Sequence, residues 1–184
     1  MTVQSATAEN IEVNVEEQEL TKIDKAKAVV RKNMYWAMGL GVIPIPLVDL
    51  VSIAGFQAKA IKELSDLYEI PFKQHAVKNI VATLFSGLGA PVCGQFLAFS
   101  FIRAIPIIGP LTGLVATPLM AGAFTYATGK VFIQHFESGG TFLNLDPVAV
   151  RAYFKEEFEK GKGIASEMLK QKPVADSNDP NKKK

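Results

Sequence analysis

Charged residues are almost absent from two long stretches of this chain, and this limits the possible folds more than any single motif does. Residues 34–58 contain one charged residue, Asp49, and residues 79–129 contain one, Arg103. A chain of 184 residues is long enough for one domain with a sizeable core. That domain must bury both stretches, either in its own interior or in a membrane.

Prolines interrupt both stretches. Pro44 and Pro46 lie in the first stretch, and Pro106 and Pro110 lie in the second. Proline lacks a backbone N–H and clashes with the preceding helical turn, so it is tolerated best where the chain turns anyway. The sequence therefore predicts two tandem apolar helical hairpins, short then long, whose apices carry these prolines. Their likeness indicates either a weak internal repeat or a chance similarity of apolar helices.

Capping and breaking residues predict the remaining helices. Asp49 is suited to cap an amphipathic helix that ends before Pro71, which in turn suits the first turn of the next helix. A longer helix is expected over residues 111–136. A C-terminal amphipathic helix is expected over residues 147–160, with Gly161 ending it. No segment favours a sheet, so the predicted fold class is all-α and membrane-associated.

The two ends of the chain differ in charge. We expect an acidic disordered tail over residues 1–21, a single helical hairpin domain over residues 22–170 and a basic disordered tail over residues 171–184. Alternating apolar residues at positions 11, 13 and 15 leave a short edge strand as the alternative for the first tail.

The second apolar stretch divides at its proline break into segments of roughly 23 and 25 residues, each close to the roughly 20 that a helix needs to span a bilayer. The first stretch is too short before Pro44 and is expected to be re-entrant or interfacial. Basic residues over 22–32 precede Tyr35 and Trp36, an order typical of entry into a membrane from an anionic leaflet. A solvated first helix of a soluble bundle would show the same order.

Basic residues flank the long hairpin. Lys73, Lys78 and Lys130 outnumber Arg103 at its tip, so the positive-inside rule predicts that both termini are cytoplasmic. The predicted location is the bacterial inner membrane.

Small residues in the long hairpin recur at four-residue spacing, which lets helices approach closely in lipid. This predicts helix packing and self-association through Gly109, Gly113, Ala123 and Ala127. The predicted partners are a second copy of the chain and the lipid bilayer.

Two further pairs of residues are candidate sites. Asp49 and Arg103 each lie near a hairpin apex, so they are candidates for an intramembrane ion pair. The alternative is that Asp49 only caps its helix while Arg103 reaches a headgroup. Phe154 and Phe158 form one stripe of the last helix, for which we predict a partner-docking role.

The sequence offers little for catalysis. His75 and His135 have no Cys, His or carboxylate at metal-ligand spacing, and the carboxylates over residues 156–159 are expected to face solvent. A net charge of +2 without a basic aromatic face argues against nucleic acid as a partner. We therefore expect no catalytic residue, no metal and no cofactor.

Three segments carry a family resemblance: "IPIPLVDLVSIAGFQAKAIKELSDLYEIP", "IRAIPIIGPLTG" and "AGAFTYATGKVFIQHFESGG". They resemble the bacterial YcjF-like domain of unknown function, which is often attached to, or encoded beside, Era-like GTPases. The match covers about residues 26–162, and its more specific parts are the Ile-Pro-x-Pro-x-x-Asp break, Gln57 and residues 125–130. The resemblance implies a helical, membrane-associated domain that works with a GTPase or another partner, here in trans.

The predicted function is thus a non-catalytic membrane-associated scaffold or adaptor that self-associates and works with such a partner. The alternative is a soluble helical bundle with a buried hydrophobic hairpin that binds lipid or inserts into membranes on a trigger.

Overall fold

Six helices make up the computed structural model, which describes residues 3–40, 48–102 and 109–170. They are α1 (Val3–Leu40), α2 (Val48–Leu67), α3 (Gln74–Gly87), α4 (Ala90–Ile102), α5 (Gly109–Glu137) and α6 (Arg151–Lys170). No strand occurs in these ranges, so the all-α prediction is confirmed for them.

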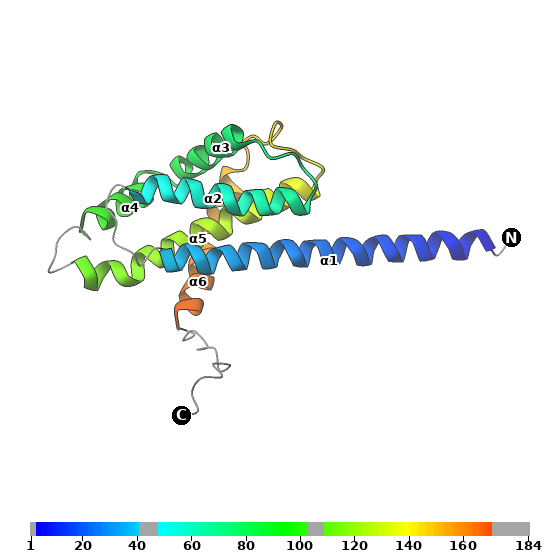
Figure 1. Cartoon of the computed structure of the whole chain (residues 1–184), viewed down its shortest axis with the longest axis horizontal. Helices are drawn as coiled ribbons and strands as arrows, with labels where there is room; N and C mark the ends of the chain where they lie inside the picture. Colours follow the sequence, from blue (N-terminus) through cyan, green and yellow to red (C-terminus); the bar gives the residue numbers. More distant parts are fainter. Residues whose placement is uncertain (1–2, 41–47, 103–108, 171–184) are drawn as a thin grey trace, which may run out of the picture.

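α5 lies at the centre of the fold and packs against α1, α2, α4 and α6. Figure 1 shows α1, α2 and α5 along the long axis of the molecule, with α6 running across it. Gly129 of α5 lies against Val30, and Gly122 lies against Met38, so α1 and α5 are antiparallel. α2 runs parallel to α5.

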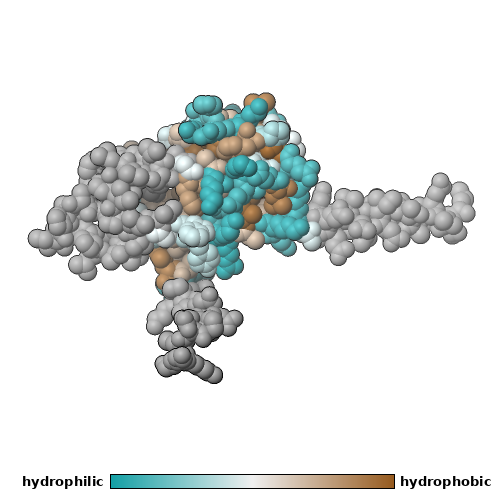
Figure 2. All heavy atoms as spheres, viewed as in Figure 1, coloured by the Kyte–Doolittle hydropathy of each residue, from teal (hydrophilic) through white to brown (hydrophobic). Residues whose placement is uncertain are grey.

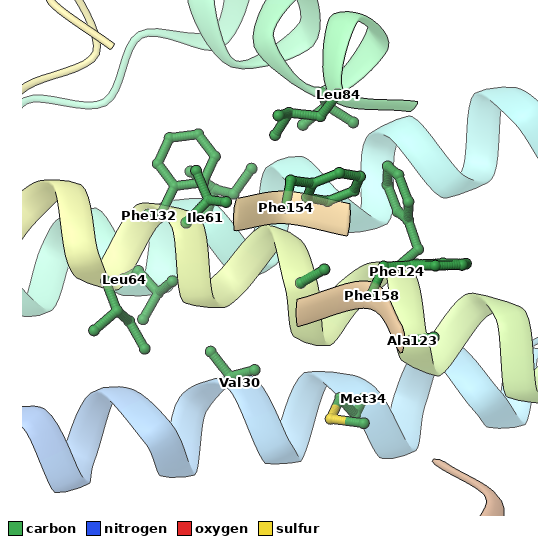
Figure 3. Packing of buried hydrophobic residues seen from close by; sticks show 14 of the residues in the cluster. Val30, Met34, Ile61, Leu64, Leu84, Ala123, Phe124, Phe132, Phe154 and Phe158 are labelled. Carbon is green, nitrogen blue, oxygen red and sulfur yellow. The ribbon is translucent and has the colours of Figure 1, made fainter. Parts of the chain in front are cut away.

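The core gathers side chains from α1, α2, α3, α5 and α6, and Figure 3 shows part of this cluster. Its largest fully buried members include Met34 of α1, Ile61 and Leu64 of α2, Leu84 of α3, Phe124 and Phe132 of α5, and Phe154 and Phe158 of α6. We call residues 22–38, 55–88 and 118–170 the body. The body surface visible in Figure 2 is mostly hydrophilic.

α1 begins far earlier than predicted. The acidic segment expected to be disordered is helical from Val3 onward, and the alternating apolar residues 11, 13 and 15 lie within that helix. The physical reason is that no glycine or proline occurs between Val3 and Met38, so nothing interrupts the helix that the body nucleates around Ala26. The predicted tail over residues 171–184 lies outside the described residues.

Two predicted helix ends are confirmed. After α2, Glu69 adopts a left-handed backbone (φ 59°) and the Ile70 N–H donates to the Ser65 carbonyl at 2.8 Å, directly before Pro71. After α5, Gly139 has φ 75° and the Gly140 N–H donates to the His135 carbonyl at 2.9 Å. Both ends use the Schellman arrangement, in which a left-handed residue lets the chain satisfy the last carbonyls.

Two other boundaries differ from prediction. The first arm of the long hairpin is divided at Gly89, whose φ is +89°, and Pro91 lies in the first turn of α4. α6 begins at Arg151, after a turn in which the Asp146 carboxylate accepts from the Val148 N–H at 2.8 Å, and it continues past Gly161 to Lys170. Gly161 does not end the helix because it packs on α5.

Candidate functional site

Four helix ends lie together at one end of the molecule (Figure 1). There α1 and α4 end, and α2 and α5 begin. We call residues 39–40, 48–54, 90–102 and 109–117 the apolar end. Asp49 is the one charged residue in these ranges. Helices with so few charged residues are ordinarily covered by other apolar groups, from protein or from lipid.

α4 makes the strongest case for a partner at the apolar end. Its sequence, APVCGQFLAFSFI, has no charged residue. The helix makes its main contacts with α3 and α5. Ala90, Pro91, Gly94 and Ala98 are exposed. A helix that is apolar all round is ordinarily covered on every side, by protein or by lipid. The described part of the chain does not cover α4 in this way.

Aromatic side chains of α1 border the apolar end. Trp36 is 60% exposed and Tyr35 is 48% exposed, although both are large and apolar. Lys25, Arg31 and Lys32 precede them and are also exposed. The order of basic and aromatic residues seen in the sequence therefore lies on a solvent-accessible surface.

The prediction of two membrane spans finds no support in the helices. Across residues 3–40, 48–102 and 109–170, none of the helices is both long enough and apolar enough to cross a bilayer. α3 and α4, which replace the predicted first arm, have 14 and 13 residues and so rise only about 20 Å each, against a hydrocarbon core of about 30 Å.

Several predicted sites fall outside the described residues. These are the apex prolines Pro44, Pro46 and Pro106, and Arg103. The proposed Asp49–Arg103 ion pair therefore stays a prediction. Pro110 is the second residue of α5, where its missing N–H leaves no helical bond unmade.

Two of the four predicted packing residues serve the fold of a single chain. Ala123 and Ala127 of α5 are completely buried in the body, so they are not available to a second copy. Gly109 and Gly113 lie in the first turns of α5. α6 approaches α5 closely at Gly161, where an added Cβ would lie 2.9 Å from backbone atoms of Ala123.

The predicted docking face on α6 is wrong. Phe154 and Phe158 are 0% and 1% exposed, because their stripe faces α5 and packs on Phe124. The loop before α6 exposes apolar residues instead: Leu143 is 82% exposed and Val148 is 59% exposed. This loop lies at the opposite end of the body from the apolar end (Figure 1).

His135 holds that loop in place. Its Nε2 is 2.9 Å from the Thr141 carbonyl oxygen and 3.1 Å from Asn144 Oδ1. Because both partners are acceptors, Nε2 carries the proton and donates. The His135 side chain is thus structural, and the exposed His75 is separate from it.

A polar seam joins α1, α2 and α5 inside the body. Gln57 Nε2 donates to Thr125 Oγ1 at 2.8 Å, and these two residues belong to the segments that carry the family resemblance. Asn33, completely buried, donates to Glu63 Oε2 at 2.9 Å. Asn33 lies at helical spacing from the buried Val30 and Ala37, so the sequence pattern places it on the buried face but does not indicate its partner.

Glu63 also accepts from Lys32 Nζ at 2.8 Å. Burial raises the pKa of the Glu63 carboxyl, but the hydrogen bonds from Lys32 and Asn33 and the positive charge of Lys32 outweigh burial and hold it below its ordinary value. Glu63 therefore stays ionised and ties α2 to α1.

Glu157 is buried, although the carboxylates over residues 156–159 were expected to face solvent. Glu157 is 3% exposed, and Lys160 bridges it to Glu156 at 2.7 and 2.8 Å. Burial first, and then the charge of Glu157, raise the pKa of Tyr126. Within the described ranges no three His, Cys, Asp or Glu side chains gather as a metal site would need.

Comparisons with known proteins agree with the sequence resemblance. Residues 6–162 match the profile of a family described as "Domain of unknown function (DUF697)". A relative from Magnetospirillum gryphiswaldense, named "Magnetosome membrane protein 22", is 35% identical over 154 residues, which are 84% of this chain and 79% of the relative. No solved structure matches the chain.

Proposed function

The chain belongs to the DUF697 family of unknown function, and from that premise we propose that it is a non-catalytic scaffold held at a membrane by its apolar end. The predicted membership of such a family is thereby confirmed. The observation that carries the proposal is α4, which is uncharged along its whole length and only partly covered by α3 and α5. Lipid would supply the missing apolar surroundings.

The relative's printed name supports this setting, because that protein is named as a membrane protein. The bacterial inner membrane, with both termini in the cytoplasm, remains the proposed location. With the apolar end in lipid, the loop that carries Leu143 and Val148 would point away from the bilayer (Figure 1). The proposed GTPase or other partner would then meet the chain on the side away from the membrane.

Self-association is part of the proposal, but Ala123 and Ala127 cannot supply its contacts. Ala123 and Ala127 already pack inside one chain. The uncovered side of α4, which exposes Ala90, Pro91, Gly94 and Ala98, is one apolar surface that a second copy could use.

A matched pair of exposed alanines tests the attachment. Ala98 lies on α4 and Ala152 lies on α6, and both are exposed. We expect Ala98→Glu to release the full-length chain from cell membranes into the soluble fraction, because a carboxylate on α4 would have to enter lipid. Ala152→Glu should remain membrane-bound. Equal fractionation of the two variants, with unchanged helical circular dichroism, would contradict attachment through the apolar end.

A second candidate is the helical bundle that inserts only on a trigger. One observation favours it: the predicted first spanning arm is divided at Gly89, and α3 packs Val77, Ile80 and Leu84 into the body core. Alkaline carbonate washing separates the two candidates. A chain that stays with the membrane is stably inserted, whereas release into the supernatant favours the bundle.

A further inference from the structure

α1 presents a second kind of membrane contact beside the apolar end. Its exposed ridge consists of Lys25, Arg31, Lys32, Tyr35 and Trp36. We propose that this α1 ridge binds anionic lipid headgroups and sets the depth at which the apolar end enters the bilayer. The inference rests on the proposed membrane attachment and names the lipid class that it recognises.

The ridge lies on the side of α1 that faces away from the core. The opposite side carries the buried residues Ala26, Val30, Asn33, Met34 and Ala37. Lys25, Lys32 and Trp36 are seven and four residues apart and so fall on one helical face. No acidic residue occurs between Lys25 and Leu40. α1 therefore contributes only positive charge to this face, followed by aromatic rings, while Glu63 of α2 neutralises Lys32.

Two of its cations are unpaired within the described part of the chain. Lys32 is held by Glu63, whereas Lys25 and Arg31 have no ion-pair partner there. A guanidinium that projects into solvent suits bidentate binding of a phosphate group. Charge complementarity thus favours a phosphate-rich surface over a neutral one.

Helix geometry places these groups at different depths. α1 follows the long axis of the molecule toward the apolar end, so it would stand steeply to the bilayer (Figure 1). Tyrosine and tryptophan favour the boundary between headgroups and acyl chains. Arg31 precedes Trp36 by five residues and lies about 7.5 Å further out, within a headgroup layer of about 5–8 Å. Lys25 lies about 16 Å further out than Trp36, beyond that layer, so Arg31 would make the headgroup contact while Lys25 would add only longer-range attraction to the anionic surface.

The single tryptophan of the chain makes this geometry measurable. The purified full-length chain is mixed with phosphatidylcholine vesicles, or with vesicles that also contain phosphatidylglycerol, and then floated. We expect binding to the mixed vesicles to be stronger, with a blue shift of Trp36 fluorescence and quenching by brominated acyl chains. Arg31→Gln should weaken binding to the mixed vesicles about fivefold and leave binding to phosphatidylcholine unchanged.

Lys155→Gln is the matched control, because it removes the same charge from an exposed position on α6. Its binding should equal that of the parent chain. Equal losses from the two variants would show that net charge alone matters and would overturn the ridge. Equal binding to both vesicle types would also overturn the ridge, but the proposal that the apolar end attaches to membranes would still hold. Failure to bind either vesicle would overturn both proposals. Preference for soluble polyglutamate over vesicles would replace lipid by an acidic protein and overturn the inference.

Discussion

The body and the apolar end are both made largely of apolar helices, yet they differ in where charge lies. In the body, α2 buries Ile61 and Leu64 on one side and exposes Lys59 and Lys62 on the other. At the apolar end, α4 carries no charge on any side. An amphipathic helix turns its charged side to solvent and its apolar side to the core, so the helices of the body can bury their apolar sides against one another. The sequence of an uncharged helix such as α4 does not determine whether protein or lipid covers it.

If this comparison is right, substitutions should separate into two classes. Changes in the body should lower the free energy of unfolding, while changes on the exposed side of α4 should alter membrane attachment and leave that free energy almost unchanged.

Phe154→Ala should destabilise the body most. The ring is fully buried and packs edge-on against Phe124 at a centroid distance of 5.6 Å. Removing a buried phenyl group loses its burial and leaves a cavity, which together lower the free energy of unfolding by about 3–5 kcal/mol. Leu169→Ala on the same helix is the control, because Leu169 is 39% exposed. Urea unfolding measures both, and similar losses would mean that α6 is not a core helix.

Gly161 tests how closely α6 approaches α5. Gly161→Ala would place a Cβ 2.9 Å from Ala123 backbone atoms, which have no flexible side chain to yield. We expect a loss of about 1–3 kcal/mol in the free energy of unfolding. Gly163→Ala, two residues along, has open space around it and should stabilise the chain by about 0.5–1 kcal/mol. Stabilisation by both changes would show that the two helices lie further apart.

The helix ends and the contacts of α6 show what the sequence could predict. Pro71 and the Ser-Gly-Gly at residues 138–140 act through local backbone geometry, so both helix ends were predictable. The stripe of Phe154 and Phe158 was visible as well. Its direction was not, because periodicity shows that a face is apolar but not whether that face meets the core or a partner. Gly161 looked like a helix end because a close interhelical contact leaves no local signal.

Longer-range features were harder still to predict. The break at Gly89 was not predicted, since a sequence alone does not show that α3 turns its face into the core. The hydrogen bond of Asn33 was not predictable, because its partner, Glu63, lies 30 residues away in the sequence. Conversely, the uncharged character of the apolar end was evident from the start, but its surroundings depend on a partner that the chain does not contain.

The polar seam should give a smaller and strictly pairwise effect. Thr125→Val removes the hydroxyl that accepts from Gln57 and leaves a buried amide without a partner. The double variant Gln57→Leu/Thr125→Val removes both groups and should be more stable than the sum of the single losses predicts. We expect a coupling of about 1 kcal/mol in a double-mutant cycle of unfolding free energies. Additive losses would show that the two side chains do not meet.

The smallest effect is expected at the edge of the body furthest from the apolar end, where Tyr68 donates its hydroxyl to Glu137. Burial first, then that hydrogen bond and the Glu137 charge, raise the pKa of Tyr68 well above its ordinary value of 10.0. The unfolded chain therefore ionises first. The contribution of Tyr68 is complete below pH 10 and declines as the pH rises toward its higher folded pKa.

The expected result is that Tyr68→Phe flattens the loss of stability above pH 10, where the unfolded tyrosine ionises. Because Tyr68 is only partly buried, water screens the Glu137 charge, and the difference between variant and parent should stay under about 1 kcal/mol. Tyr35→Phe supplies the control, since Tyr35 is exposed on α1 and should follow the parent curve. Urea unfolding across this pH range measures all three. Parallel curves for Tyr68→Phe and the parent would mean that the hydroxyl contributes no pH-dependent stability, so that packing alone holds this edge of the body.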